Sequence, residues 1–225
     1  MTATDKPFVK ICCIANEAEA RMAVAHGVNA IGLVSAMPSG PGVIADEQIA
    51  HIARSVPASM ATFLLTARQT AADIVRQHGL CRTTTIQLVD EVPEQDLQEL
   101  RALLPGIRLV QVIHVVGENS VAQAQAVAPL VDALLLDSGN PALHIKELGG
   151  TGRTHDWTLS RRICRGSPVP VWLAGGLNPS NVGTALQEVG PYGVDICSGV
   201  RTDGRLDADK LDRFVAAARV WSFTS

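Results

Sequence analysis

PVPVWLAGGLNPSNVGTALQEVGPYGVDICSGV, residues 168 to 200, is the stretch that decides the fold of this chain. Its apolar run from Val169 to Leu173 predicts a strand buried on both faces, which breaks into a turn at Gly175-Gly176. A helix start is expected at Asn178-Pro179-Ser180-Asn181, because proline suits the first helical turn. A second strand is expected from Tyr192 to Cys197, and it runs into Ser198-Gly199. The stretch therefore predicts two buried strands, each ending in a glycine turn, with a helix between them.

The glycine turns indicate a phosphate site. A backbone without a Cβ lets a ligand approach closely, and N–H groups at such turns and at a helix start bind anions. In parallel α/β barrels, phosphate usually sits in the loops after the seventh and eighth strands. We therefore expect substrate binding at Gly175, Gly176, Asn178, Ser198 and Gly199; the alternative is two ordinary strand-to-helix turns.

Apolar strand-like runs alternate with segments of helical period along the rest of the chain. Six earlier strands are expected, at residues 8–14, 30–35, 60–66, 83–88, 107–114 and 131–137. Together with the two above they make eight strand–helix units spaced by about 25–30 residues, which is typical of a single (β/α)8 TIM barrel over residues 1–225. A doubly wound sheet is the alternative, but it usually has fewer strands and a glycine-rich first turn, whereas Ile14-Ala15-Asn16 has no glycine.

The composition limits the partners of the chain. It has 225 residues, of which 47% are apolar, and a net charge of −3 with both signs interspersed, which argues against a nucleic-acid partner. No run is apolar enough to span a membrane, and residues 1–7 lack a signal-peptide pattern, so a cytoplasmic protein is expected. The odd number of cysteines and the lack of a CxxC pair favour free thiols over disulfides or a metal site. The cysteines are Cys12, Cys13, Cys81, Cys164 and Cys197.

Candidate reactive groups stand where the expected strands end, which is where the active sites of such barrels lie. These strand-end residues are Lys10, Cys12, Ser35, Gln87, His114 and Asp137. A thiol and a carboxyl group that face each other across a barrel mouth can act as base and acid. Cys12 has the alternative role of a small buried apolar residue. Asp137 ends an apolar run, where a carboxylate needs a partner or a task.

Three further predictions concern the surroundings of these groups. Asp195 is expected either to bind a sugar hydroxyl or to form an internal ion pair with Lys10. The loop from Gly149 to Arg153, with Gly150 and Gly152 as candidate ligand contacts, is expected to order over a ligand or to be a flexible surface loop. Side-chain alternation along a strand predicts that Cys13 points away from the face that carries its neighbour Cys12.

Four motifs carry a family resemblance. Val9-Lys10-Ile11-Cys12-Cys13-Ile14-Ala15 resembles the V-K-I-C-G-I-T that opens the phosphoribosylanthranilate isomerase family of tryptophan biosynthesis. Leu135-Leu136-Asp137, followed by residues 149–157, is similar to the family's L-L-D and G-G-[ST]-G-[KR]-T-x-D-W. Residues 174–182 match A-G-G-L-N-P-x-N-V, and residues 191–200 match P-[YF]-x-V-D-x-S-S-G-V except for a cysteine in place of the first serine.

The resemblance implies an aldose–ketose isomerase, an intramolecular oxidoreductase that carries out an Amadori rearrangement in a TIM barrel. It implies that Asp137 is the general acid that protonates the ribose ring oxygen, and that the Cys12 thiolate is the base that takes the C2 proton. A nearby cation such as Lys10 would raise the fraction of Cys12 that is ionised. It also implies a sugar-phosphate substrate, a monomer or homodimer, and no metal or organic cofactor.

The chain departs from the family pattern at several places. Cys13 replaces a glycine, Ala15 a threonine, Val89 a histidine and His114 a lysine. In the loop after the second strand the family carries an arginine that meets the anthranilate carboxylate, but residues 35–42, SAMPSGPG, hold no basic residue. The catalytic pair and the glycine turns for the phosphate are kept, whereas the arginine that would bind the aryl carboxylate is missing.

Three functions stay open at this stage. The first is a phosphoribosylanthranilate isomerase with a rebuilt carboxylate site. The second is an isomerase of the same chemistry that acts on another N-substituted aminoaldose phosphate. The third is a non-catalytic barrel that binds a phosphorylated ligand.

Overall fold

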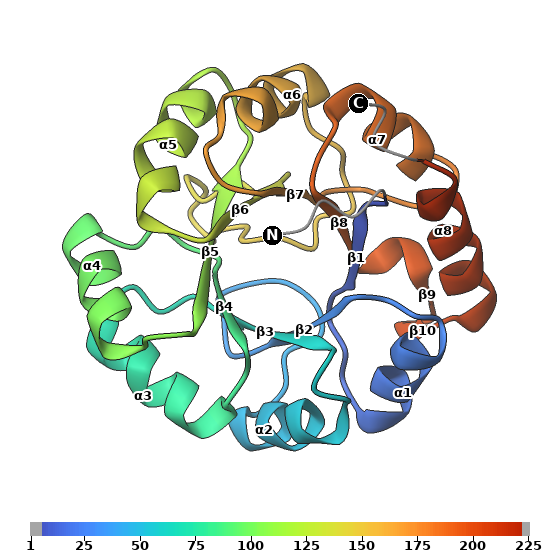
Figure 1. Cartoon of the computed structure of the whole chain (residues 1–225), viewed down its shortest axis with the longest axis horizontal. Helices are drawn as coiled ribbons and strands as arrows, with labels where there is room; N and C mark the ends of the chain where they lie inside the picture. Colours follow the sequence, from blue (N-terminus) through green and yellow to red (C-terminus); the bar gives the residue numbers. More distant parts are fainter. Residues whose placement is uncertain (1–5, 222–225) are drawn as a thin grey trace.

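Eight parallel strands form a closed barrel in the computed structural model, which describes residues 6–221. The strands pair in chain order, and the eighth returns to the first, where Lys10 is in register with Asp195. Their bounds are β1 Phe8–Ile11, β2 Ala30–Val34, β3 Ala61–Thr66, β4 Thr85–Leu88, β5 Arg108–His114, β6 Ala133–Asp137, β7 Val171–Leu173 and β8 Gly193–Ile196. In Figure 1 the helices form a ring around these strands. The expected (β/α)8 fold is confirmed, and the doubly wound alternative is wrong.

A helix follows every strand and packs its apolar side on the outside of the barrel. The bounds are α1 Glu17–Ala25, α2 Asp46–Ser55, α3 Ala71–Cys81, α4 Glu94–Leu103, α5 Asn119–Val127, α6 Trp157–Gly166, α7 Val182–Val189 and α8 Ala208–Val220. Local caps fix several starts: Asn16 Oδ1 accepts a hydrogen bond of 3.0 Å from the Glu19 N–H before α1. Asp156 Oδ1 accepts one of 2.8 Å from the Thr158 N–H before α6.

Alternate strand residues belong to two separate apolar layers. Leu109 and Ile113 of β5 pack outward against the helices, while Val110 and Val112 fill the barrel interior. In the interior the Trp172 ring meets Phe8 and Tyr192 edge-on, with centroids 6.3 and 5.5 Å away. Since Phe8 begins β1 and Tyr192 precedes β8, these aromatic rings lie at the end of the barrel where the strands begin.

The structure differs from the sequence expectation in local details. β1 ends at Ile11 and not at Ile14, because Cys13 has a φ of 61° and turns the chain out of the extended conformation. The helix expected from Asn178 begins at Val182. Two short strands, β9 Arg201–Thr202 and β10 Arg205–Leu206, form an antiparallel hairpin after β8. Two-residue strands are too short to leave a periodic pattern in the sequence.

None of the helices within residues 6–221 is both long and apolar enough to cross a membrane. The expectation that the chain has no signal peptide rests on residues 1–7, of which the first five lie outside the described part.

Candidate active site

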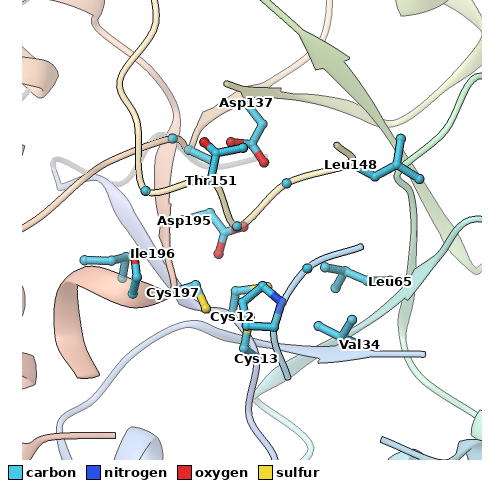
Figure 2. Close-up of a pocket in the computed structure, with 18 of the residues that line it drawn as sticks. Cys12, Cys13, Val34, Leu65, Asp137, Leu148, Thr151, Asp195, Ile196 and Cys197 are labelled. Atoms are coloured by element: carbon cyan, nitrogen blue, oxygen red, sulfur yellow. The ribbon is translucent and has the colours of Figure 1, made fainter. Parts of the chain in front are cut away.

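A pocket opens at the end of the barrel where the strands finish, and Figure 2 shows it from close by. We call the residues that line it the pocket wall. Both candidate catalytic residues and seven of the candidate binding residues belong to the wall. They are Cys12 and Asp137, with Gln87, Gly150, Gly152, Gly175, Gly176, Asp195 and Ser198. The fold thus brings together residues from β1, β4, β6, β7 and β8 that are far apart in the sequence.

Three candidate binding residues lie outside the wall. Lys10 is fully buried beneath the pocket, with its Nζ 2.7 Å from Asp195 Oδ2 and 5.0 Å from the centroid of the Phe63 ring. The internal ion pair considered for Lys10 and Asp195 is therefore present. Asn178 is occupied in its own turn, where its Oδ1 accepts from the Ser180 N–H at 2.9 Å. Gly199 packs so closely that a Cβ there would lie 2.2 Å from the carbonyl oxygen of Leu177.

Asp137 ends β6 and holds its carboxyl group in the pocket. Burial raises its pKa above the usual value of 3.8, and the nearby Asp195 carboxylate acts in the same direction. The Ser138 N–H, which donates to Oδ1 at 2.7 Å, opposes this rise in the pKa, and so do the electrostatic contributions of His114 and of the Lys10 ammonium. Asp137 therefore keeps its proton to a higher pH than an exposed aspartic acid does.

Cys12 follows β1 at the bottom of the pocket. A Cβ on Gly32 would lie 2.9 Å from Cys12 Sγ and 3.1 Å from Lys10 Nζ, so the missing side chain of Gly32 gives both groups their space. The Lys10 ammonium thus lies next to the thiol. Although burial acts to lower the pKa of Lys10, the Asp195 carboxylate and, to a smaller extent, Cys12 hold it above the usual value of 10.5. Lys10 therefore stays a cation beneath the thiol.

Cys13 lines the same pocket as Cys12, so the prediction that it points to the opposite face is wrong. Alternation holds only within a strand, and Cys13 comes after the end of β1 in a left-handed conformation. Hydrogen bonding to Cys12 and then to Cys197 raises the pKa of the Cys13 thiol well above its usual value. The hydrogen bond from Cys13 lowers the pKa of Cys197. Figure 2 shows the three cysteines together at one end of the pocket.

Two wall residues offer acceptors that the protein itself does not use. Within the described residues, Gln87 Oε1 and Asp195 Oδ1 are buried without a hydrogen-bond partner. An unmet buried acceptor costs about 1–3 kcal/mol, so each is suited to a donor on a ligand, such as a sugar hydroxyl.

The glycine turns meet at the edge of the pocket. Gly175 and Gly176 have φ values of 83° and 62°, a conformation that glycine adopts without strain. A Cβ on Gly176 would lie 2.6 Å from the backbone of Arg153 and Thr154, and one on Gly152 would lie 3.8 Å from Ser198 Oγ. The loops after β6, β7 and β8 therefore converge with their backbones exposed to the same space. Such a cluster of backbone groups at glycine turns is suited to a phosphate.

The long loop after β6 is held in place by side-chain hydrogen bonds. Thr151 Oγ1 lies 2.6 Å from Ser138 Oγ, and Ser39 Oγ donates to the Lys146 carbonyl at 2.6 Å. A Cβ on Gly149 would lie 2.8 Å from Asp137 Oδ2, so glycine is needed where the loop passes the carboxyl group. The loop lines the pocket, as it must if it orders over a ligand, which was one of the two roles expected from the sequence.

Among the described residues, no group of three or more histidine, cysteine or acidic side chains has an arrangement that would hold a metal ion. The pocket wall supplies thiols, carboxyl groups and backbone groups.

Comparison with known proteins assigns the chain to a family. A family model described as N-(5'phosphoribosyl)anthranilate (PRA) isomerase matches residues 9–217. The chain belongs to the phosphoribosylanthranilate isomerase family. The resemblance drawn from the sequence motifs is thereby confirmed.

Relatives of this isomerase family match the chain over nearly its whole length. The N-(5'-phosphoribosyl)anthranilate isomerase of Methanocella arvoryzae is 33% identical over 213 residues, covering 94% of this chain and 98% of its own. That of Haloferax volcanii is 36% identical over 216 residues, with coverages of 94% and 92%. The crystal structure of the Thermotoga maritima enzyme superposes with a TM-score of 0.81 at 27% identity, covering 94% of this chain and 98% of that one. Another solved isomerase, with a TM-score of 0.78 at 25% identity and coverages of 94% and 98%, holds reduced 1-(o-carboxyphenylamino)-1-deoxyribulose 5-phosphate.

The departure of this isomerase from the family motif at Cys13 has a visible structural consequence. The left-handed φ of 61° suits glycine, the residue of the family motif, and a non-glycine residue is strained there. A Cβ on Gly42 would lie 2.6 Å from the Cβ of Cys13. The side chain of Cys13 therefore contacts the loop after β2 at Gly42, where the loop has no side chain of its own.

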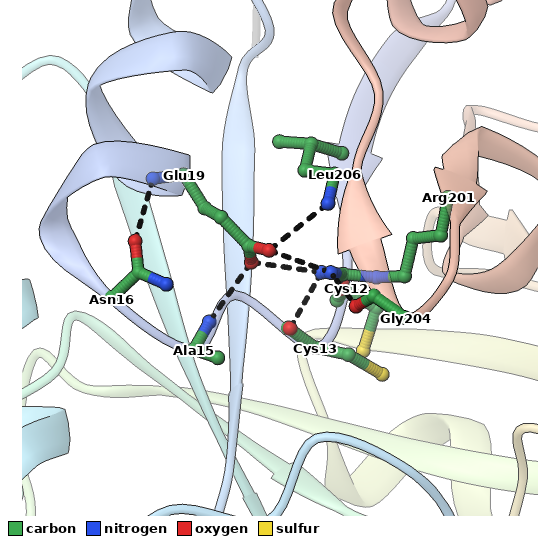
Figure 3. A network of polar contacts seen from close by, with 8 residues as sticks. All are labelled: Cys12, Cys13, Ala15, Asn16, Glu19, Arg201, Gly204 and Leu206. Carbon is green, nitrogen blue, oxygen red and sulfur yellow. Dashed lines mark hydrogen bonds and ion pairs between the residues drawn. The ribbon is translucent and has the colours of Figure 1, made fainter.

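A buried ion pair, which sequence reasoning missed, fixes the turn that carries the two cysteines of this isomerase (Figure 3). The Arg201 guanidinium donates to Glu19 Oε1 at 2.8 Å and to the carbonyl of Cys13 at 2.6 Å. Glu19 also accepts from the backbone N–H groups of Ala15 at 3.1 Å and Leu206 at 3.0 Å. The network ties α1 and the β9–β10 hairpin to the residues just after β1.

We expect Glu19→Gln to lower the free energy of unfolding by about 3–5 kcal/mol, because it leaves the Arg201 charge buried without its partner. The side chains of Arg201 and Glu19 are only 9% and 10% exposed. Urea unfolding at neutral pH measures the effect. The matched control is Glu17→Gln: Glu17 pairs with Arg21, which is 66% exposed, and losing such a surface pair costs about 1 kcal/mol or less.

The same network predicts a pH dependence. Although burial acts to raise the pKa of Glu19, hydrogen bonds from Arg201, Leu206 and Ala15 hold it below the usual 4.5. A carboxyl group with a lowered native pKa stabilises the fold above its unfolded pKa, and this stability is lost as the pH falls through the native value. The wild type should therefore lose stability below pH 4.5 more steeply than Glu19→Gln does. Equal slopes for the two proteins would contradict this role of Glu19.

Proposed function

We propose that this chain catalyses the Amadori rearrangement of N-(5-phosphoribosyl)anthranilate to the 1-deoxyribulose 5-phosphate product. The observation that carries the proposal is one pocket that joins a carboxyl group of raised pKa, Asp137, to the thiol of Cys12. The glycine turns after β7 and β8 lie at the edge of the same pocket. The relatives that carry the isomerase name cover almost the whole chain, which supports the same reaction.

The proposed reaction needs one proton donor and one proton acceptor. Asp137 gives its proton to the ribose ring oxygen while the bond between this oxygen and C1 breaks, leaving a protonated imine at C1. The cationic imine makes the proton on C2 acidic, and the Cys12 thiolate removes it to give an enolamine. The enolamine then becomes the ketone: the proton held by Cys12 goes to C1, and the C2 hydroxyl gives its proton to the Asp137 carboxylate, which returns both groups to their starting states. No electron leaves the substrate, since the oxidation of C2 is balanced by the reduction of C1.

The other wall residues are suited to hold the substrate. We propose that the backbone N–H groups at Gly175, Gly176 and Ser198 bind the phosphate, with the loop of Gly150 and Gly152 over it. Gln87 and Asp195 take sugar hydroxyls through their unmatched acceptors. Lys10, Asn178 and Gly199 support the site from outside the wall. Lys10 is a positioning residue that keeps a positive charge beneath Cys12.

A direct isomerase assay tests the proposal. Purified protein is mixed with N-(5-phosphoribosyl)anthranilate, and the loss of its fluorescence is followed against an uncatalysed control. Growth of a tryptophan auxotroph that lacks this step tests the same activity in a cell. Turnover supports the function. If no N-substituted aminoribose phosphate reacts, a non-catalytic barrel that binds phosphorylated ligands takes its place.

We expect Gly176→Val to raise KM for the sugar phosphate about ten- to hundredfold, the effect of losing hydrogen bonds to a charged group. The new side chain would meet the backbone of Arg153 and Thr154 at a position with a φ of 62°, so the phosphate turn must move. Steady-state kinetics and the binding of inorganic phosphate measure the effect. Gly183→Ala is the control, because a Cβ at Gly183 on α7 meets nothing within 4 Å. An unchanged KM in Gly176→Val would place the phosphate elsewhere.

The proposal also covers the cellular location and the oligomeric state of the protein. We propose a cytoplasmic enzyme, which suits a pathway enzyme whose cysteines within the described residues are all free. We also propose that the protein acts as a monomer or as a homodimer, and one solved isomerase similar to this chain, that of Thermotoga maritima, is described as dimeric. Light scattering together with the isomerase assay tests the second statement.

A further inference from the structure

The pocket wall carries no cationic side chain. Among the residues that line it within the described part of the chain, the only acidic or basic side chains besides the cysteines are the acids Asp137 and Asp195. A second anionic group on a substrate, apart from its phosphate, would therefore meet no cation there, and only neutral donors such as Gln87 and Thr151 beside carboxyl groups and apolar side chains. An anion that leaves water for such surroundings loses solvation without gaining an ion pair.

The side of the pocket away from the phosphate turns is apolar. Val34, Leu65 and Leu148 stand together there in Figure 2, across the pocket from Ile196 and Cys197. Met37 and Pro41 of the loop after β2 add further apolar side chains to the pocket wall. With the phosphate at the β7 and β8 turns and C1 near Cys12 and Asp137, the group on the ribosyl nitrogen lies against these apolar side chains. They form what we call the aglycone wall: Val34, Met37, Pro41, Leu65 and Leu148.

The polar group nearest in sequence to this wall is turned away from it. Ser35 ends the run of β2 but donates its hydroxyl to Asp46 Oδ1 at 2.6 Å and accepts from Gln77 Nε2 at 2.6 Å. Both partners belong to helices outside the barrel. Ser35 is therefore not available to an aglycone.

The cations in the surrounding loops are already engaged. Lys146 Nζ lies 2.6 Å from Asp90 Oδ2, and Arg153 pairs with Glu147. Arg201 pairs with Glu19 and donates to backbone carbonyls, as described above. Moving Lys146 into the pocket would leave Asp90, which is only 7% exposed, without its partner, whereas Arg153 is 61% exposed and would give up only a surface ion pair with Glu147. The Ser39 hydroxyl also ties the loop after β2 to the Lys146 carbonyl at 2.6 Å, which holds the two loops together.

We infer that this isomerase recognises an uncharged aryl or alkyl group on the ribosyl nitrogen, and that it accepts N-aryl ribosylamine 5-phosphates without a carboxylate at least as well as the anthranilate derivative. The inference rests on the proposed isomerase function and adds the class of substrate. The aglycone wall binds the ring by apolar contact, and none of its side chains can form an ion pair with an ortho carboxylate. The substrate range is thus wider than anthranilate and includes the aniline derivative.

The test compares two substrates with the wild-type protein. Ribose 5-phosphate is condensed with aniline or with anthranilate, and the kcat/KM of each N-aryl ribosylamine 5-phosphate is measured. The expected value for the aniline derivative equals or exceeds that for the anthranilate derivative. A tenfold or larger preference for anthranilate overturns the inference and leaves the isomerase function intact.

Binding of stable analogues separates recognition from chemistry. N-(5-phosphoribityl)aniline and N-(5-phosphoribityl)anthranilate, made by reductive amination, differ only in the carboxylate and cannot react. Calorimetric titration should give the aniline analogue the same or a lower Kd. Tight binding of both without turnover of either substrate refutes the proposed function, while the ratio of the two Kd values still decides the inference. A tenfold lower Kd for the anthranilate analogue overturns the inference.

A substitution in the aglycone wall supplies the missing charge. Met37 lies in a loop and is only partly buried. We expect Met37→Arg to shift the kcat/KM ratio towards anthranilate about ten- to hundredfold, the gain from a charge-assisted hydrogen bond. Met37→Gln, of similar length but uncharged, should leave the ratio within a few-fold of wild type. Equal shifts in both variants would show that the effect is steric, and they would contradict the inference.

Discussion

Asp137→Asn is expected to lower kcat by about 10²–10⁴-fold while KM changes little. The amide keeps the shape of the side chain, and its oxygen can still accept the hydrogen bond that the Ser138 N–H donates to Oδ1 at 2.7 Å. What it cannot do is give a proton to the ribose ring oxygen as the C1–O bond breaks. This interaction develops in the transition state, so its loss appears in kcat. Steady-state kinetics on a verified substrate measure both constants.

The pH profile gives an independent readout of the same group. A general acid must carry its proton, so the rate falls as the pH rises through its pKa. Burial raises the pKa of Asp137 above 3.8, which moves this fall to a higher pH than an exposed aspartic acid would give. In Asp137→Asn the residual rate should lack this limb. A limb that persists unchanged in the variant would assign the acid role to another group.

The control for this variant is Asp212→Asn. It makes the same chemical change on α8, where the side chain is exposed to solvent. Its kcat and KM should equal those of wild type. Calorimetric binding of N-(5-phosphoribityl)aniline to Asp137→Asn shows whether the pocket is still formed. If the variant binds this analogue normally and also turns over normally, Asp137 has no catalytic task.

The barrel was predictable because its signals are local and repeated. Buried parallel strands appear as apolar runs, and helices appear through their period, so all eight units could be placed to within a few residues. The strand ends then point to one mouth, where Cys12, Gln87, Asp137 and Asp195 line one pocket. Ser35 and His114, which the same rule named, do not line it.

The backbone after a strand end was not predictable from the same rules. Alternation along an extended chain placed Cys13 on the far face, but its left-handed φ of 61° turns it into the pocket. A positive φ at a non-glycine residue is held by long-range contacts, here by Arg201 from a hairpin 188 residues away. The Glu19–Arg201 pair has no sequence pattern for the same reason, since neither residue lies in a motif.

The charge of the pocket wall could not be predicted from the sequence either. The sequence showed that residues 35–42 hold no basic residue, but it did not show whether Lys146 or Arg153 of the loop after β6 reaches the pocket. Only their ion pairs with Asp90 and Glu147 show that both are engaged outside the wall.

Cys12→Ser is expected to reduce kcat about as strongly as Asp137→Asn, by roughly 10²–10⁴-fold. Serine has nearly the shape of cysteine, but its hydroxyl loses a proton only at a pH several units higher than a thiol does. A base that is not ionised cannot take the C2 proton, even though the Lys10 ammonium lies beneath it. Binding of N-(5-phosphoribityl)aniline should be retained. Rapid-mixing kinetics with the aniline and anthranilate substrates measure the loss.

Cys164→Ser is the matched control, and Cys13→Gly is not. Burial raises the pKa of the Cys164 thiol to about 12, and this residue sits on α6, outside the pocket wall, so its change to serine should leave kcat within a few-fold of wild type.

Cys13 hydrogen-bonds to Cys12 and Cys197, so Cys13→Gly removes a neighbour of the base while it relieves a strained φ. We expect Cys13→Gly to keep the reaction, because Cys12 and Asp137 both remain in the pocket wall. If Cys12→Ser and Asp137→Asn both keep near-normal turnover, the two-residue mechanism is wrong, because the pocket would then carry out the proton transfers without either group.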